Sequence, residues 1–269
     1  MESLAVDAPA VDALAVEALA VAWEPSAGPV YEPLIELPPT DGRRAMESFF
    51  SASLRLPVRD LAVLAEGRPG VAELARQALS GLPAPSAPQA FVLVQQSHDH
   101  EHLSMPLPRL VEEMPWEVSE DLGLSHGQEH GGLAALDLLR WVLEPGGHAV
   151  LVLSDRPEVC VRDALPSGAV VALRLVRGEG PLNVVGQGWG TPPTDASRVL
   201  DAVGPCGGWV ALHRSLGERA AAPGELILLR EAAPAAPGGH PPGWLMLRAN
   251  ANADVNADVN VRTPAGGTA

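Results

Sequence analysis

The chain has 269 residues, of which 46% are hydrophobic, and a formal net charge of −15. This length and apolar content suffice for a substantial buried core, so the sequence predicts one folded domain or two fused halves. Nucleic acid and anionic membrane surfaces select clustered positive charge, and the acidic balance argues against both as partners.

Cys160 and Cys206 are the only cysteines, and they lie far apart in the sequence. Two isolated cysteines exclude a disulfide framework and a cysteine zinc cluster. A secretory leader needs basic residues near its start, but no lysine or arginine precedes Arg43. No apolar run approaches the length of a membrane span. We therefore expect a cytoplasmic location, and nothing in the sequence calls for a cofactor.

The two ends of the chain have biased composition. Residues 1–22 repeat a small-apolar and acidic theme and predict a low-complexity tail, in which residues 19–23 are the earliest candidate strand. Residues 249–269 repeat Asn-Ala-Asp-Val and predict a disordered tail. Between them, the apolar spacing predicts helices over 58–66 and 69–81.

A histidine-rich stretch follows the first strongly predicted strand. Residues 90–94 form a short apolar run typical of a buried parallel strand, and His98, His100 and His102 come directly after it. In an extended chain these three histidines face one way and, with a carboxylate, offer a zinc site. No other part of the sequence supplies a matched ligand set, so we favour a solvated loop at a subunit contact.

The most informative segment for the fold and the function is residues 122–155, in which a glycine-flanked turn, a helix and a strand follow one another. A glycine pair at 131–132 opens an apolar helix that ends before Pro145, and a buried strand follows at 149–153. Further on, the pattern predicts a strand, two helices and two more strands, at 167–176, 196–203, 209–216, 226–230 and 244–248. Strands and helices joined by short glycine-rich turns indicate a layered α/β domain.

One interpretation of this segment is a metal site. His126, Glu129 and His130 form an H-x-x-E-H string, in which two histidines one helical turn apart bind zinc and the glutamate activates water. The glycine pair directly after His130 weakens a helix that must hold both ligands. Zinc-dependent hydrolysis therefore stands as an alternative.

The other interpretation is a resemblance. Residues 129–136, Glu-His-Gly-Gly-Leu-Ala-Ala-Leu, resemble the Cys-x-Gly-Gly-x-Ala-Ala-Leu nucleophile turn of thiolase-like condensing enzymes such as hydroxymethylglutaryl-CoA synthase and ketoacyl synthase III. Further stretches are similar to the family's strands and bends in the same order, at 149–155, 168–173, 204–212 and 226–247. The resemblance implies an α/β, thiolase-like layered αβαβα fold with a compact or truncated second half. The resemblance also implies that residues 23–190 form a ketoacyl-synthase-like N-terminal half and that residues 191–248 form an abbreviated C-terminal half.

The sequence departs from this family at its catalytic positions. Glu129 stands where the cysteine nucleophile belongs, and the catalytic histidine of the second half falls on Pro205 or Cys206. The resemblance thus implies a degenerate, chain-length-factor-like subunit that forms a dimer with an active ketosynthase. It would act on acyl chains bound to acyl carrier protein, in fatty-acid-like or polyketide biosynthesis.

These considerations give the candidate site residues. Glu129 is the candidate catalytic residue, and His126, His130 and Cys206 are candidate binding residues. An acyltransferase or decarboxylase that uses Glu129 is a further alternative. We expect the dimer face to include residues 90–106 and the segment leading into Glu129.

Overall fold

The computed structural model describes most of the chain between residues 13 and 250. The described residues are 13–23, 31–36, 38, 40, 44–45, 47–48, 52, 57–65, 68–85, 87–95, 106–125, 131–156, 159–161, 168–202, 204–231 and 241–250. Among these residues, no helix is long and apolar enough to cross a membrane.

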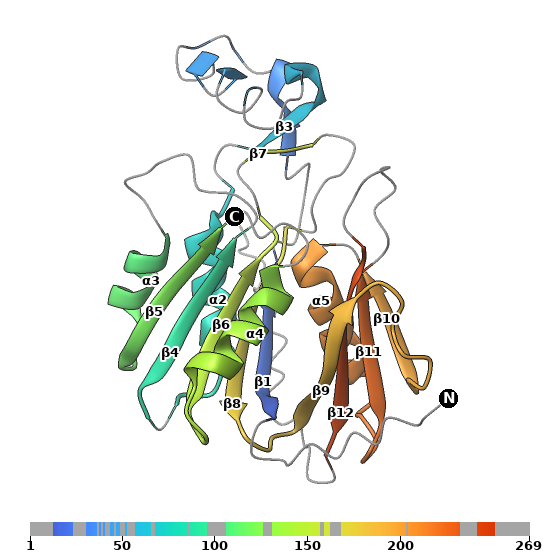
Figure 1. Ribbon diagram of the computed structural model, residues 1–269. Helices are drawn as coiled ribbons and strands as arrows, with labels where there is room; N and C mark the ends of the chain where they lie inside the picture. The colour runs from blue at the N-terminus through green and yellow to red at the C-terminus, as the bar shows by residue number, and fades with distance from the viewer. Residues whose placement is uncertain are drawn as a thin grey trace.

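A nine-stranded mixed sheet forms the body of the molecule (Figure 1). Its strands, in spatial order, are β10 (Arg198–Ala202), β11 (Leu226–Glu231), β12 (Gly243–Ala249), β9 (Leu182–Trp189), β1 (Leu14–Ala22), β8 (Val170–Arg177), β6 (His148–Ser154), β4 (Gln89–Gln95) and β5 (Val118–Ser125). β4 pairs in parallel with both β6 and β5, whereas β1 is antiparallel to β8 and β9. The expected boundary between the two halves, at residue 190, falls between β9 and β10. Strand β9, before this boundary, is hydrogen-bonded to β12, which comes after it in the sequence.

In the described part of the chain, helices α2 to α5 cover the sheet and divide its side chains into two clusters. Alternate residues of β6 show the division: Leu151 and Leu153 pack with α4 (Gly131–Val142) and α5 (Gly204–Glu218). Val150 and Val152 pack with α2 (Val71–Ser80) and α3 (Pro106–Glu113). Because β6 is buried on both faces, it reads in the sequence as an unbroken apolar run.

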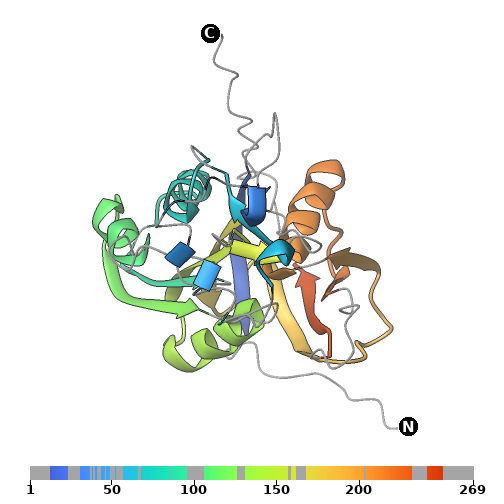
Figure 2. The ribbon, with the colours of Figure 1, turned by 90° about the horizontal axis from the view of Figure 1, so that it is seen from above.

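A small three-stranded sheet lies beyond the carboxyl ends of β4 and β6 (Figure 1). It consists of β2 (Tyr31–Pro33), β3 (Leu61–Leu64) and β7 (Val159–Val161), with β3 in the middle. Two short 3-10 helices, Leu34–Glu36 and Val58–Asp60, flank its strands. Figure 2, seen from above, shows this sheet over the central strands of the large one.

Most elements that the sequence predicted are present. The helices near residues 69–81 and 133–143 are α2 and α4, and the segments at 209–216, 226–230 and 244–248 belong to α5, β11 and β12. The strands expected at 90–94 and 149–153 are β4 and β6, and they lie side by side in one sheet. The thiolase-like interpretation depended on this pairing.

The prediction of a tail over residues 1–22 is wrong from residue 14 onward, and the candidate strand at 19–23 largely coincides with the second half of a longer strand. Leu14–Ala22 form β1, a buried strand in the middle of the large sheet. The alternation of alanine, valine and leucine that looked like low complexity is the composition of a strand covered on both faces. Its one charged residue, Glu17, accepts a hydrogen bond from Arg174 Nε and lies 3.2 Å from His148 Nδ1.

Two predicted helices are strands or partly so. Residues 58–66 were expected to be helical, but only Val58–Asp60 make a short 3-10 turn before β3. Within the segment 196–203, which was expected to be helical, Arg198–Ala202 form β10, which pairs in parallel with β11. In both cases backbone pairing with a distant strand outweighs a local propensity worth less than about 1 kcal/mol per residue.

Strand β4 is internal, which corrects the expected dimer face. Its residues from Ala90 to Val94 are buried between β6 and β5, so the strand at 90–94 is not available for a partner. Among the described strands, the edge of the sheet next to β4 is β5, which the sequence did not predict as a strand. β5 ends at Ser125, in the segment that leads toward Glu129.

Candidate functional site

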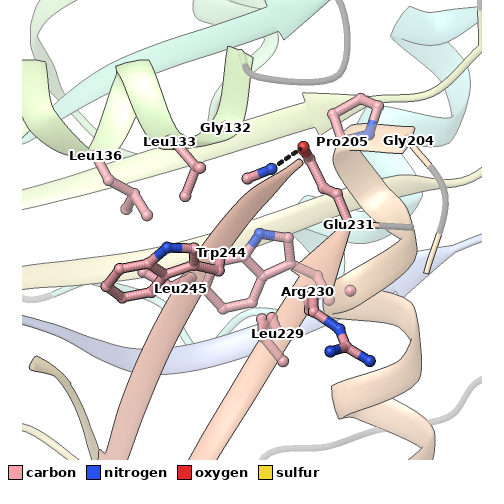
Figure 3. A pocket seen from close by; sticks show the side chains of 13 residues that line it. Gly132, Leu133, Leu136, Gly204, Pro205, Leu229, Arg230, Glu231, Trp244 and Leu245 are labelled. Atoms are coloured by element: carbon pink, nitrogen blue, oxygen red, sulfur yellow. Dashed lines mark hydrogen bonds between the residues drawn. The ribbon is translucent and has the colours of Figure 1, made fainter. Parts of the chain in front are cut away.

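A pocket of about 430 Å³, part of it open to solvent, lies where the first turns of α4 and α5 meet the ends of β11 and β12 (Figure 3). Its wall is mainly apolar and glycine-rich. The lining residues are Gly132, Leu133, Leu136, Gly204, Pro205, Gly208, Trp209, Leu229, Arg230, Glu231, Gly243, Trp244 and Leu245. Small-molecule sites are likewise concave, mostly apolar and supplied with a few polar groups.

The backbone at the start of α5 requires a glycine. Gly204 has a φ of +76°, a conformation that side chains with a Cβ disfavour. A Cβ at this residue would also lie 3.0 Å from Asp155 Oδ2. The carboxylate of Asp155, at the end of β6, therefore occupies the space beside the first residue of α5, where the helix dipole favours negative charge.

The two charged residues of the wall point in opposite directions. Glu231 extends toward Pro205 and the backbone amide of Gly243 (Figure 3), which donates a 2.9 Å hydrogen bond to Glu231 Oε2. Arg230 turns to the other face of β11, where its guanidinium binds Asp201 at 2.6 and 2.9 Å. Glu231 is thus the charged group that the described residues present at the pocket.

Trp244 forms an aromatic wall of the pocket and depends on two glycines of β9. It lies directly across from Gly188 in the β9–β12 ladder. A Cβ on Gly188 would lie 2.9 Å from Trp244 Cζ2, and one on Gly186 would lie 3.3 Å from Trp244 Cζ3. The indole therefore packs against bare backbone, and this contact fixes its position.

Cys206 lies in the first turn of α5 but does not line the pocket. Its side chain is completely buried, and its thiol donates a 3.3 Å hydrogen bond to the Leu153 carbonyl oxygen. Burial raises the pKa of the thiol well above its usual value, and the nearby carboxylate of Asp155 adds to the shift. The neighbours Gly204, Pro205 and Gly208 line the pocket instead.

The second cysteine is remote from the pocket wall. Cys160 is buried in the small sheet, in contact with Tyr31 and Ala62. Burial raises the pKa of its thiol to about 12, and the charge of Asp155 contributes. Burial likewise raises the pKa of Tyr31 above its usual range. With a thiolate this unfavourable, Cys160 is a packing residue.

The remaining candidate site residues lie outside the described part of the chain. These are Glu129, His126 and His130, together with His98, His100 and His102. α4 begins at Gly131, so the described helix starts directly after the H-x-x-E-H string. Within the described residues, no group of three or more His, Cys, Asp or Glu side chains could hold a metal ion.

The sequence drew attention to the heads of both helices but missed much of the pocket wall. Trp244 was assigned only to an expected strand, and Glu231 directly follows the strand expected at 226–230. The signal that points to them is the resemblance of residues 226–247 to the closing strands of a condensing enzyme. Gly243 and Gly188 had no signal of their own, because their role depends on strands brought together by the fold.

Solved structures of known proteins have a similar fold. No protein-family model matches the sequence, and no curated protein matches it. Among solved structures, the acyltransferase ChlB3 is similar over 90% of this chain and 99% of its own, with 12% identity and a TM-score of 0.59. A 3-oxoacyl-(acyl carrier protein) synthase III from Pseudomonas aeruginosa PAO1 is similar over 88% and 98%, with 15% identity and a TM-score of 0.53.

A third structure, HMG-CoA synthase complexed with CoA, is similar over 88% of this chain and 82% of its own, with 10% identity and a TM-score of 0.55. At these identities the likeness concerns the fold. The chain has the mixed α/β fold of the thiolase-like enzymes, as the resemblance of its bends and strands predicted.

Proposed function

We propose that this protein is a catalytically degenerate ketosynthase-like subunit that binds an acyl chain and pairs with an active ketosynthase. The pair would act on acyl chains carried by acyl carrier protein, in fatty-acid-like or polyketide biosynthesis. One observation carries the proposal. An apolar pocket lies between the heads of α4 and α5, and neither cysteine of the chain faces it.

The chemistry of acyl condensation explains why this observation matters. A thioester-forming enzyme needs an accessible thiolate, whose pKa is lowered by a helix N-terminus or a neighbouring cation. Here both thiols are buried and their pKa values are raised. A chain with this fold and an apolar pocket retains the means to hold an acyl chain, but lacks the cysteine that would carry it.

The edge of the large sheet supports pairing with another subunit. Among the described strands, β5 is bonded to β4 alone, and its residues from Ser119 to Gly123 are exposed. Leu122, a large apolar side chain, is 39% exposed on this strand. An unpaired edge strand offers its backbone N–H and C=O groups to a strand of a second chain. We propose that the ketosynthase partner docks here.

Co-expression with any ketosynthase that is encoded beside this protein, followed by size-exclusion chromatography, tests the pairing. We expect a heterodimer that Leu122→Arg disrupts, because the new charge lies on the docking strand. Val199→Arg is the matched control, since Val199 is 47% exposed on β10, at the opposite edge of the same sheet. If both variants eluted as heterodimers with the partner, the proposal that β5 forms the interface would be wrong. If the native chain eluted as a monomer, separate from the ketosynthase, the proposed pairing itself would be wrong.

A second candidate function is an acyltransferase or decarboxylase that uses Glu129. The sequence places Glu129 two residues before Gly131, where α4 begins at the pocket. Incubation with a radiolabelled acyl thioester tests this candidate. Our proposal expects no protein-bound label and no turnover above the level of a Glu129→Gln variant. Label or turnover that Glu129→Gln abolishes would establish the enzyme instead.

A further inference from the structure

The side of α4 that faces away from the sheet is apolar and largely exposed. Trp141 is 88% exposed and Val142 is 46% exposed, although both are large apolar side chains. They lie three and four residues after Leu138, which is partly buried, so the three side chains share one side of the helix. A helix that is apolar on nearly all sides is usually covered by protein on nearly all sides.

The edge strand β5 extends this surface. α4 packs against β5 as well as against β4 and β6. Leu122 of β5 is the register partner of Val92, whose side chain belongs to the same cluster as the buried side chains of α4. Residues in register on neighbouring strands point to the same face of a sheet, so the exposed side chain of Leu122 lies on the α4 side of the edge. The outer apolar surface consists of Leu122, Leu138, Trp141 and Val142.

Carboxylates border the outer apolar surface. Glu120 precedes Leu122 by two residues and therefore lies on the same face of β5. Asp137 and Glu144 lie about one helical turn before and after Trp141. Glu120 and Glu144 are exposed, and neither forms an ion pair with another described residue.

Two basic residues beside this surface are already engaged. Arg140, the basic residue of α4, lies 3.5 Å from Asp137. Arg177 donates a hydrogen bond to the Leu143 carbonyl oxygen, just after the end of the helix. The surface therefore presents apolar side chains within an acidic border, on a chain whose formal net charge is −15.

This charge pattern argues against a second copy of the chain as the occupant of the surface. Two identical chains in a closed dimer pair through the same patch on each, because the dimer is two-fold symmetric. Such a pairing would bring the two acidic borders together, and like charges in direct opposition destabilise an interface. A different chain, with basic residues around an apolar patch, would meet opposite charge instead.

We infer that the outer apolar surface docks a partner subunit whose contact patch is apolar at its centre and bordered by arginine or lysine, and that Trp141 is its main apolar contact. The inference rests on the pairing proposed above and names the surface and the chemistry of that contact. Interface energy concentrates in a few side chains, among which tryptophan is enriched. Basic residues opposite the carboxylates would favour the correct encounter, and backbone pairing along β5 would set the orientation.

Calorimetric titration of this chain with a ketosynthase encoded beside it measures each contribution. We expect Trp141→Ala to weaken binding at least about thirtyfold and Glu120→Arg at least about tenfold. Raising the salt concentration from about 0.05 M to about 0.5 M should weaken binding of the native chain about tenfold, because salt shortens the range of charge attraction.

The matched controls lie at the opposite edge of the sheet. Val199→Ala shortens an exposed apolar side chain on β10, and Asp195→Arg reverses an exposed charge in the segment before it. Each should change the affinity less than about twofold. Because all four altered side chains are exposed, circular dichroism should show the native fold in every variant.

The possible results separate the inference from the pairing on which it rests. Native affinity in Trp141→Ala would overturn the inferred surface while leaving the pairing in place. An affinity that neither Glu120→Arg nor salt changes would overturn the basic border of the partner. A homodimer of the native chain that Trp141→Ala converts to a monomer would make a second copy the occupant. Failure of the native chain to bind the ketosynthase would overturn both the proposed pairing and this inference.

Discussion

The Cys206 thiol donates a hydrogen bond to the Leu153 carbonyl oxygen across a sulfur–oxygen distance of 3.3 Å. This bond ties the first turn of α5 to the end of β6, beneath the pocket rather than inside it. Cys206 thus contributes packing at the head of α5, and neither cysteine lines the pocket.

The first prediction concerns thiol reactivity. In the folded protein at pH 8, iodoacetamide should modify neither Cys206 nor Cys160 within an hour, because both side chains are buried and the pKa of each thiol is raised. A pKa near 12 leaves about one Cys160 thiol in ten thousand ionised at this pH. Intact-mass spectrometry measures the adducts. Two adducts after unfolding in guanidinium are the control, and rapid single modification of the native chain would contradict the prediction.

The second prediction concerns a buried ion cluster at the other end of α5. Glu225 accepts hydrogen bonds from Arg198 at 2.9 and 3.1 Å, from Arg219 at 2.7 Å and from the Ala222 amide at 2.8 Å. Removal of the carboxylate would leave Arg198, which is 9% exposed, without its counter-charge. Glu225→Gln should therefore lower the free energy of unfolding by about 3–5 kcal/mol at pH 7, measured by urea denaturation.

The same cluster has a pH signature. Burial alone would raise the pKa of Glu225, but the hydrogen bonds from Ala222 and Arg198 and the charges of Arg198 and Arg219 outweigh it and lower the pKa. A carboxylate with a lowered folded pKa stabilises the protein above its unfolded pKa, about 4.3, and this stabilisation is lost as the pH falls through the folded value. The stability gap between the native chain and Glu225→Gln should narrow below pH 4.3. Asp201→Asn, which breaks a surface ion pair, should cost far less.

The sequence predicted this fold best where an element is continuous and strongly apolar. β4, β6 and α4 have unbroken apolar runs between clear turn residues, so each was located from local pattern alone. β1 could not be located from its local pattern, because its mixture of alanine and valine with an acidic residue resembles a low-complexity tail. Its burial depends on β8 and β9, which lie more than 140 residues further along the chain.

The candidate site was predictable only in part for a related reason. Glycine-rich turns before two apolar helices marked the heads of α4 and α5, and the pocket does lie there. The direction of a side chain on a strand, by contrast, depends on register. Whether Glu231 or Arg230 faces the pocket is decided by the pairing of β11 with β10 and β12, which local sequence does not specify.

The third prediction separates the metal interpretation from the others. Protein purified without a histidine tag should contain less than about 0.1 equivalent of zinc by plasma mass spectrometry. The measurement is decisive because a structural or catalytic site would bind zinc tightly enough to retain it during purification. The variants His126→Ala and His100→Ala should have the same metal content as the native chain. One equivalent of zinc that disappears in His126→Ala would restore the hydrolase alternative. Loss in His100→Ala alone would place a metal in the histidine-rich stretch.

The fourth prediction uses the contact between Gly188 and Trp244. A Cβ at position 188 would lie 2.9 Å from Trp244 Cζ2 and 3.1 Å from Cε2, and a rigid indole cannot relieve this overlap by bending. Gly188→Ala should therefore displace the ring, weaken the binding of octanamide, an amide that probes the proposed acyl pocket, and lower the free energy of unfolding by about 1–3 kcal/mol. Gly217→Ala is the control, since Gly217 lies within α5 with nothing within 4 Å of a Cβ, and should stabilise the protein by about 0.5–1 kcal/mol. Binding of octanamide to Gly188→Ala at native affinity, with unchanged tryptophan fluorescence, would show that the indole does not form the pocket wall.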